Sequence, residues 1–115
     1  MTDYYVIFTN ILPDVAEVRF YEETVDHVIA EHPEVPIELP SIRTAVGSAI
    51  TNPTHIESSY NNSLVFVDAN TTNASGDPLR VPVKQVSGNS ARVKTVYFAS
   101  STGEPIIIWR REDNE

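Results

Sequence analysis

The hydrophobic pattern changes its period within residues 41–60, which read SIRTAVGSAITNPTHIESSY. In the first half, apolar residues recur three or four positions apart, which predicts a helix from about Ser41 to Ile50. Asn52-Pro53 ends this helix, because proline lacks a backbone donor and restricts the residue before it. After Pro53 the pattern becomes extended and rich in β-branched residues. The stretch therefore separates a helical region from a region of strands.

Outward from this stretch, the same reasoning predicts one earlier helix, from Glu22 to Glu31, which ends before Pro33. Because successive strands follow successive helices, we expect one α+β domain over residues 1–115, with two helices packed on a mainly antiparallel sheet of four or more strands. Pro82 cannot donate to a sheet ladder, which places its strand at an edge or beside a bulge. The predicted strands are Tyr4–Phe8, Val15–Phe20, Ile56–Tyr60, Leu64–Ala69, Leu79–Val86, Arg92–Ser100 and Ile106–Arg110.

The composition excludes several classes of protein. With 41% hydrophobic and 21% charged residues, the chain is too apolar for wholesale disorder. It has no cysteine, which excludes disulfides, thiolate zinc sites and a cysteine nucleophile. No apolar run approaches the length of a membrane span, and no basic segment leads into an apolar one at the start. We therefore expect a cytoplasmic protein without a membrane partner.

The charge is distributed unevenly along the chain. The formal net charge is −8, yet residues 79–111 carry six cations against Glu104 as the one acid. Residues 1–70 carry two cations against eleven carboxylates. The cationic part can form an anion-binding face, and it can equally be the solvated side of a sheet.

Two of the three histidines, His27 and His32, lie close enough in sequence to share a site. Their spacing of five residues separates them by about 140° on an ideal helix, whereas a metal pair prefers a spacing of four. We therefore expect no metal and no cofactor. Without a shared site, His32 is a helix-end cap or a partly buried packing residue, and His27 is an ordinary exposed histidine.

Several motifs occur in an order that resembles a known superfamily. HVIAEHPE at residues 27–34 is followed by the helix that ends at Asn52-Pro53, then by LRVPVK at 79–84, VKTVYF at 93–98 and a late strand with Ile108 and Trp109. Over residues 24–109 the chain resembles the phage-associated branch of the small metal-independent ribonucleases that include barnase, EndoU, the tRNA-cutting colicins and RelE. The resemblance implies two helices on a four-stranded antiparallel sheet, with the site on the open face of the sheet or at its rim. Pro82 inside a strand, the long loop before Arg80 and the acidic charge depart from the pattern of this superfamily.

The resemblance implies RNA cleavage in which the neighbouring 2′-hydroxyl attacks phosphorus, so the protein must move two protons and neutralise charge. In a regular strand Lys94 faces away from Thr95, so both can serve the site only if a bulge intervenes. Otherwise Thr95 and Tyr97 belong to the core or sheet surface, and the cations form a solvated edge. The implied catalytic residues are His27, His32 and Thr95, and the implied substrate-binding residues are Lys84, Arg92, Lys94 and Tyr97.

The sequence leaves more than one function open. The first is a toxin effector or a nuclease of a phage or mobile element, with RNA and a cognate inhibitor or other protein as partners. The second is a noncatalytic acidic binding or inhibitor protein, whose clustered carboxylates would be Glu22, Glu23, Asp26, Glu31 and Glu34. A third, a structural subunit of an assembly, has no motif in its favour. A nuclease is expected to gather a histidine beside the cations, and an inhibitor to expose its acids on one face.

Overall fold

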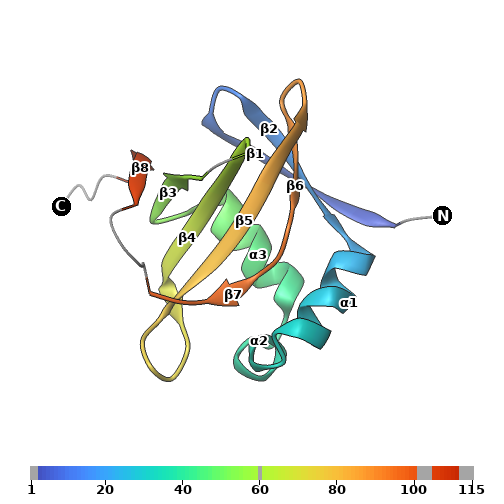
Figure 1. The fold of residues 1–115 in the computed structure, drawn as a ribbon, viewed down its shortest axis with the longest axis vertical. Coiled ribbons are helices and arrows are strands. Elements are labelled where there is room, and N and C mark those ends of the chain that lie inside the picture. The colour runs from blue at the N-terminus through green and yellow to red at the C-terminus, as the bar shows by residue number, and fades with distance from the viewer. Residues whose placement is uncertain (1–2, 60, 101–104, 112–115) are drawn as a thin grey trace.

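The computed structural model describes residues 3–59, 61–100 and 105–111, which form an α+β fold with a curled mixed sheet (Figure 1). The helices are α1 (Glu22–Glu31), α2 (Glu34–Glu38) and α3 (Ile42–Thr51). Within the described ranges, none of them has the length and apolarity that crossing a membrane requires. The strands are β1 (Tyr4–Leu12), β2 (Val15–Tyr21), β3 (His55–Ser58), β4 (Ser63–Thr72), β5 (Pro78–Ser87), β6 (Ser90–Val93), β7 (Tyr97–Phe98) and β8 (Ile106–Arg110).

Both predicted helices are present, and a third, short one corrects their number. The side-chain oxygen of Ser41 accepts a hydrogen bond from the backbone N–H of Thr44 at 3.2 Å, which caps the start of α3. The helix that was not predicted, α2, follows Pro33 and contains Pro36 in its first turn. Proline is tolerated there because first-turn N–H groups have no intrahelical partner. The two prolines therefore do not exclude this turn of helix.

The sheet has the order β1-β2-β6-β5-β4-β3-β8, and β7 pairs with β5 off this path. Six of the seven strand pairs are antiparallel, and the pair β2–β6 is parallel. The expectation of a mainly antiparallel sheet did not include this pair. Parallel neighbours require a long crossover, and here the chain between the two strands includes all three helices.

Helix α3 packs against one face of the sheet and crosses behind β4 and β5 in Figure 1. Leu79, Val81 and Val83 of β5 point to this helix face and belong to the hydrophobic core. Side chains alternate along a strand, so Arg80, Pro82 and Lys84 point to the opposite side, which we call the open face. The open face carries the polar groups described below.

Strands β6 and β7 are two parts of one extended segment, interrupted by a bulge opposite Pro82. Val83 pairs with Val93 and Arg80 pairs with Tyr97, so two residues of β5 face the three residues 94–96. Pro82 has no N–H to donate, but its carbonyl oxygen accepts a hydrogen bond from the backbone N–H of Lys94 at 2.8 Å. The expectation for Pro82 was an edge strand or a bulge; β5 lies between β4 and β6, and the bulge is the alternative that the structure has. Because of the bulge, side chains here do not alternate strictly between the two faces of the sheet. Lys94 and Tyr97 can therefore lie on the same face.

Candidate active site

Polar residues of the open face gather where β3, β4, β5 and β7 lie side by side. His55 pairs with Val67, Val67 pairs with Arg80, and Arg80 pairs with Tyr97. Glu57 lies two residues after His55 on β3 and shares its face. Residues opposite each other in neighbouring strands point to the same side of a sheet. The register therefore brings these groups together from three separate parts of the sequence.

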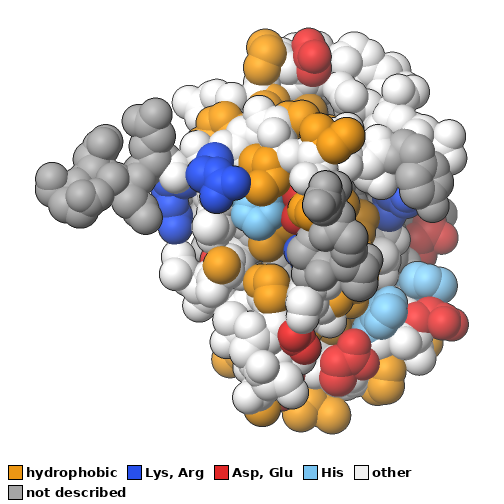
Figure 2. Space-filling view, turned by 60° about the vertical axis from the view of Figure 1, so that its left-hand side comes forward, with side chains coloured by type: hydrophobic (Ala, Val, Ile, Leu, Met, Phe, Trp, Pro, Cys, Tyr) orange, Lys and Arg blue, Asp and Glu red, His pale blue; other side chains and the backbone are white. Residues whose placement is uncertain are grey.

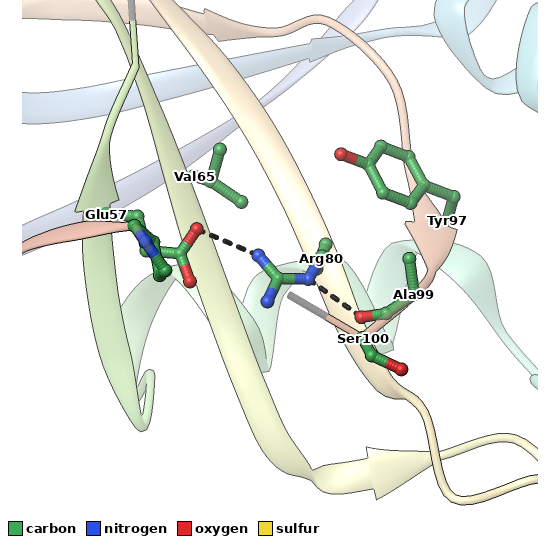
Figure 3. A pocket seen from close by; sticks show the side chains of 7 residues that line it. Glu57, Val65, Arg80, Tyr97, Ala99 and Ser100 are labelled. Atoms are coloured by element: carbon green, nitrogen blue, oxygen red, sulfur yellow. Dashed lines mark hydrogen bonds and ion pairs between the residues drawn. The ribbon is translucent and has the colours of Figure 1, made fainter. Parts of the chain in front are cut away.

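Glu57 and Arg80 form a buried ion pair at the centre of this region (Figure 3). Nη1 of Arg80 lies 2.9 Å from Oε1 of Glu57, and the two side chains are 8% and 7% exposed. Nε2 of His55 lies 2.9 Å from the other carboxylate oxygen, Oε2. Nε of Arg80 donates a hydrogen bond to the carbonyl oxygen of Ala99 at 2.8 Å. The carboxylate is thus held from two sides, and the guanidinium is held by β3 and by the residue that follows β7.

The pKa of Glu57 lies below its ordinary value. Burial by itself would raise this pKa, since the charged form loses contact with water. The hydrogen bonds from Arg80 and His55 stabilise the carboxylate and outweigh the effect of burial. Glu57 is therefore ionised at neutral pH, and its oxygens can only accept hydrogen bonds.

A pocket of about 300 Å³ lies beside this network. A guanidinium has five N–H donors, and the bonds from Arg80 to Glu57 and Ala99 occupy two of them. In residues 3–59, 61–100 and 105–111, the other donors of Arg80 have no hydrogen-bond partner. An anion in the pocket can therefore bind Arg80 while Glu57 stays in place. The pocket is lined by Glu57, Val65, Arg80, Tyr97, Ala99, Ser100 and Pro105 (Figure 3).

His32 lies at the edge of this site, next to Tyr97. Their ring centroids are 5.8 Å apart, and Tyr97 lines the pocket. His32 is also the C-cap of α1: its backbone N–H donates to the carbonyl oxygen of Val28 at 2.7 Å. Its ring Nδ1 lies 3.6 Å from a carboxylate oxygen of Glu34. The structure thus combines a helix-end position for His32 with contact to a pocket residue.

The three predicted cations gather at a second place on the open face. Lys84 pairs with Ser63 on one side and with Arg92 on the other. Nζ of Lys94 donates a hydrogen bond to the Ser63 hydroxyl at 3.3 Å. Lys84 lies four residues from Arg80 along β5, which corresponds to about 13 Å. The cations therefore lie together on the face of the pocket, but outside it.

The remaining predicted residues, His27 and Thr95, lie in different surroundings. His27 is exposed on α1, and its side chain makes no hydrogen bond or ion pair with the described residues. Thr95 lies in the bulge, where its hydroxyl is buried without a hydrogen-bond partner in the described part of the chain. Buried hydroxyls are usually satisfied, so this group is suited to receive a partner. The catalytic roles of both residues stay predictions.

Sequence reasoning did not select His55, Glu57 and Arg80 as site residues. One signal could have found Arg80, which interrupts the apolar run of residues 79–83, LRVPV. A charged residue inside such a strand needs a buried partner, because an unpaired buried charge is costly. The partner lies 23 residues away on another strand. Only the register of the sheet reveals the pair.

In the described ranges, no group of three or more His, Asp or Glu residues could hold a metal ion. Comparisons of the chain with models of known protein families, with curated proteins and with solved structures found no match. The function is therefore argued from the geometry of the site.

Proposed function

We propose that this protein is a small metal-independent ribonuclease whose active site is the pocket beside Glu57 and Arg80. The observation that carries the proposal is the buried network of His55, Glu57 and Arg80 at this pocket. It supplies a carboxylate that lies within hydrogen-bonding distance of both an imidazole and a guanidinium with unused donors. The superfamily resemblance of residues 24–109 agrees with this chemistry and implies a toxin effector or a nuclease of a phage or mobile element.

In the proposed reaction, the 2′-oxygen of a ribose attacks the adjacent phosphorus, and the bond from phosphorus to the 5′-oxygen of the next nucleotide breaks. The 2′-hydroxyl loses a proton, and the leaving 5′-oxygen gains one. The products are a 2′,3′-cyclic phosphate and a free 5′-hydroxyl. A base, an acid and a cation suffice for these steps.

We assign these tasks to residues at and beside the pocket. Glu57, kept ionised by its partners, accepts the proton of the 2′-hydroxyl. Arg80 binds the phosphate through its unused N–H donors and neutralises the charge that develops on it. We assign protonation of the leaving oxygen to His32, which lies beside the pocket residue Tyr97. His55 holds Glu57 in position through its 2.9 Å contact.

The proposal is tested by cleavage of single-stranded RNA in the presence of EDTA. General acid or base catalysis typically contributes 10²–10⁴-fold in rate, so Glu57→Gln is expected to lower kcat/KM at least about a hundredfold. Glu31→Gln, on the exposed side of α1, is the matched control and is expected to keep the activity. Circular dichroism and urea unfolding establish that each variant is folded. Wild-type activity in folded Glu57→Gln would contradict the assignment.

Two histidine variants are measured in the same assay, because the resemblance implies that His27 and His32 both transfer protons. The geometry predicts the larger loss for His32→Ala, since His32 contacts Tyr97 at the pocket and His27 is exposed on α1. A larger loss of activity in His27→Ala would indicate that the reacting groups lie on the outer side of α1 and not in the pocket.

The second candidate function, an acidic binding or inhibitor protein, is favoured by one observation. Glu23, Asp26, Glu31, Glu34 and Glu38 are all exposed on α1 and α2. Figure 2 shows acidic side chains beside histidine at the lower right of the face it draws. Such a face suits a basic partner. If the wild-type protein cleaves no RNA but inhibits a basic ribonuclease, and a variant with these five residues changed to Gln or Asn does not inhibit, the inhibitor function is supported instead.

A further inference from the structure

A row of cations crosses three neighbouring strands of the open face. Lys84 on β5 pairs with Arg92 on β6, and Arg92 pairs with Arg19 on β2 through the parallel ladder. Register partners share a face, so the three side chains project from the same side of the sheet. Neighbouring strands lie about 4.8 Å apart, so the row spans about 10 Å. Arg19 belongs to the acidic half of the sequence, and only the fold places it beside the other two.

Two aromatic rings continue this row toward the edge of the sheet. Tyr4 pairs with Tyr21, and their ring centroids are 5.0 Å apart. The guanidinium carbon of Arg19 lies 4.9 Å from the centre of the Tyr4 ring. Glu17 fixes Arg19, since its carboxylate accepts hydrogen bonds from Nε of Arg19 and from the Ser90 hydroxyl, each at 3.2 Å. The aromatic and cationic groups are therefore held in a defined arrangement at the surface.

Three of these side chains are accessible, and Lys84 and Tyr21 are half-buried. The Arg19 side chain is 37% exposed, Tyr4 is 42% exposed, and Arg92 is exposed as well. Accessible rings beside cations are typical of surfaces that bind single-stranded nucleic acid, in which bases stack on rings and phosphates contact Lys or Arg. Bases of a duplex are stacked on one another and do not reach such rings. The arrangement therefore suits an unpaired strand.

We propose that Arg19, Lys84 and Arg92, together with Tyr4 and Tyr21, bind single-stranded RNA next to the cleavage pocket. This inference rests on the proposed function, and it specifies the substrate as an unpaired strand several nucleotides long. Lys84 lies about 13 Å along β5 from Arg80, so a strand that reaches both must extend over more than one phosphate. A dinucleotide fills the pocket without reaching the row.

Binding is measured by fluorescence anisotropy with a labelled single-stranded octanucleotide made of 2′-deoxynucleotides, which lacks the attacking hydroxyl and cannot be cleaved by the proposed chemistry. Changing Arg19, Lys84 and Arg92 together to Gln is expected to lower affinity at least about tenfold at 50 mM salt and to reduce the salt slope by about 2. Tyr4→Ala is expected to lower affinity about tenfold through lost stacking. The matched control is Arg43→Gln with Tyr5→Ala, because Arg43 lies 4.6 Å from the Tyr5 ring on the helix side of the sheet. This control is expected to bind as the wild type does.

Cleavage assays distinguish a failure of the single-strand surface from a failure of the ribonuclease proposal. If both hold, the triple variant loses more kcat/KM on an octaribonucleotide than on a ribodinucleotide. If RNA is cleaved but octamer binding is the same in wild type and variants, or a duplex binds equally well, the inference is overturned and the ribonuclease proposal stands. If no RNA is cleaved but octamer binding depends on the row and on Tyr4, the single-strand surface stands and the ribonuclease proposal fails.

Discussion

The ion pair between Glu57 and Arg80 is costly to bury. Two charges lose their hydration in such a pair, and apolar residues of similar volume often stabilise a fold as well or better. Here His55 and the Ala99 carbonyl complete the hydrogen bonding, so the charges are satisfied without water. Apolar residues could fill this space, but they could not present a carboxylate and a guanidinium to the pocket. We therefore interpret the pair as part of the site.

The lowered pKa of Glu57 makes stability depend on pH in a defined direction. The folded pKa lies below the unfolded value, so the contribution of Glu57 is complete above the ordinary value of 4.5 and is lost as pH falls through the folded value. The difference in unfolding free energy between wild type and Glu57→Gln is therefore expected to shrink as pH falls below 4.5. Urea unfolding at pH 6, 5, 4 and 3 measures it, with Glu31→Gln as the exposed control. A difference that stays constant down to pH 3 would contradict the assigned cause.

Among the elements, the helices were the most predictable from sequence, because their signals are local. The bounds of α1 match the prediction, and α3 is shifted by one residue. Helix α2 was missed because Pro33 before it and Pro36 within it resembled a break. The parallel pair β2–β6 was missed because pairing between distant strands leaves no local pattern. Pro82 did indicate a bulge, since a missing donor must be accommodated wherever the strand lies.

The candidate site was harder to predict than the fold, because its residues come together only through pairing between distant strands. Lys84 and Arg92 were selected from their local charge, and the register places them side by side. His55, Glu57 and Arg80 were not selected, because they acquire their partners only across β3, β4 and β5. Arg19 lies in an acidic half of the chain and joins the cations only through the crossover to β6.

The bulge at residues 94–96 carries a testable consequence for Thr95. Leaving a buried hydroxyl without a partner costs about 1–3 kcal/mol, and valine has the same shape without the hydroxyl. Thr95→Val is therefore expected to leave the unfolding free energy unchanged or to raise it. If the hydroxyl bonds to a substrate phosphate, the same variant lowers kcat/KM for RNA. A variant destabilised by more than about 1 kcal/mol would show instead that the hydroxyl has a partner in the free protein.

On the scale of the whole molecule, the fold gathers most of the cations on one face of the sheet, where Glu17 and Glu57 pair with two of them. Of the eight Lys and Arg residues, Arg19, Arg80, Lys84 and Arg92 lie on the open face by register, and Lys94 reaches Ser63 on that face. Exposed carboxylates occupy α1 and α2. A chain with a net charge of −8 can thus present a basic surface to RNA while its acidic side disfavours nonspecific binding elsewhere.

The central claim, metal-independent cleavage through the 2′-hydroxyl, is tested most directly with DNA oligonucleotides that contain one ribonucleotide. Four such strands, one for each ribonucleotide base, are incubated with the protein in EDTA, and the products are analysed by mass spectrometry. We predict cleavage only on the 3′ side of the ribonucleotide, with a 2′,3′-cyclic phosphate on one fragment and a 5′-hydroxyl on the other. Cleavage at deoxynucleotides, cleavage only after a divalent metal is added, or no cleavage of these strands and of an all-RNA strand would contradict the account.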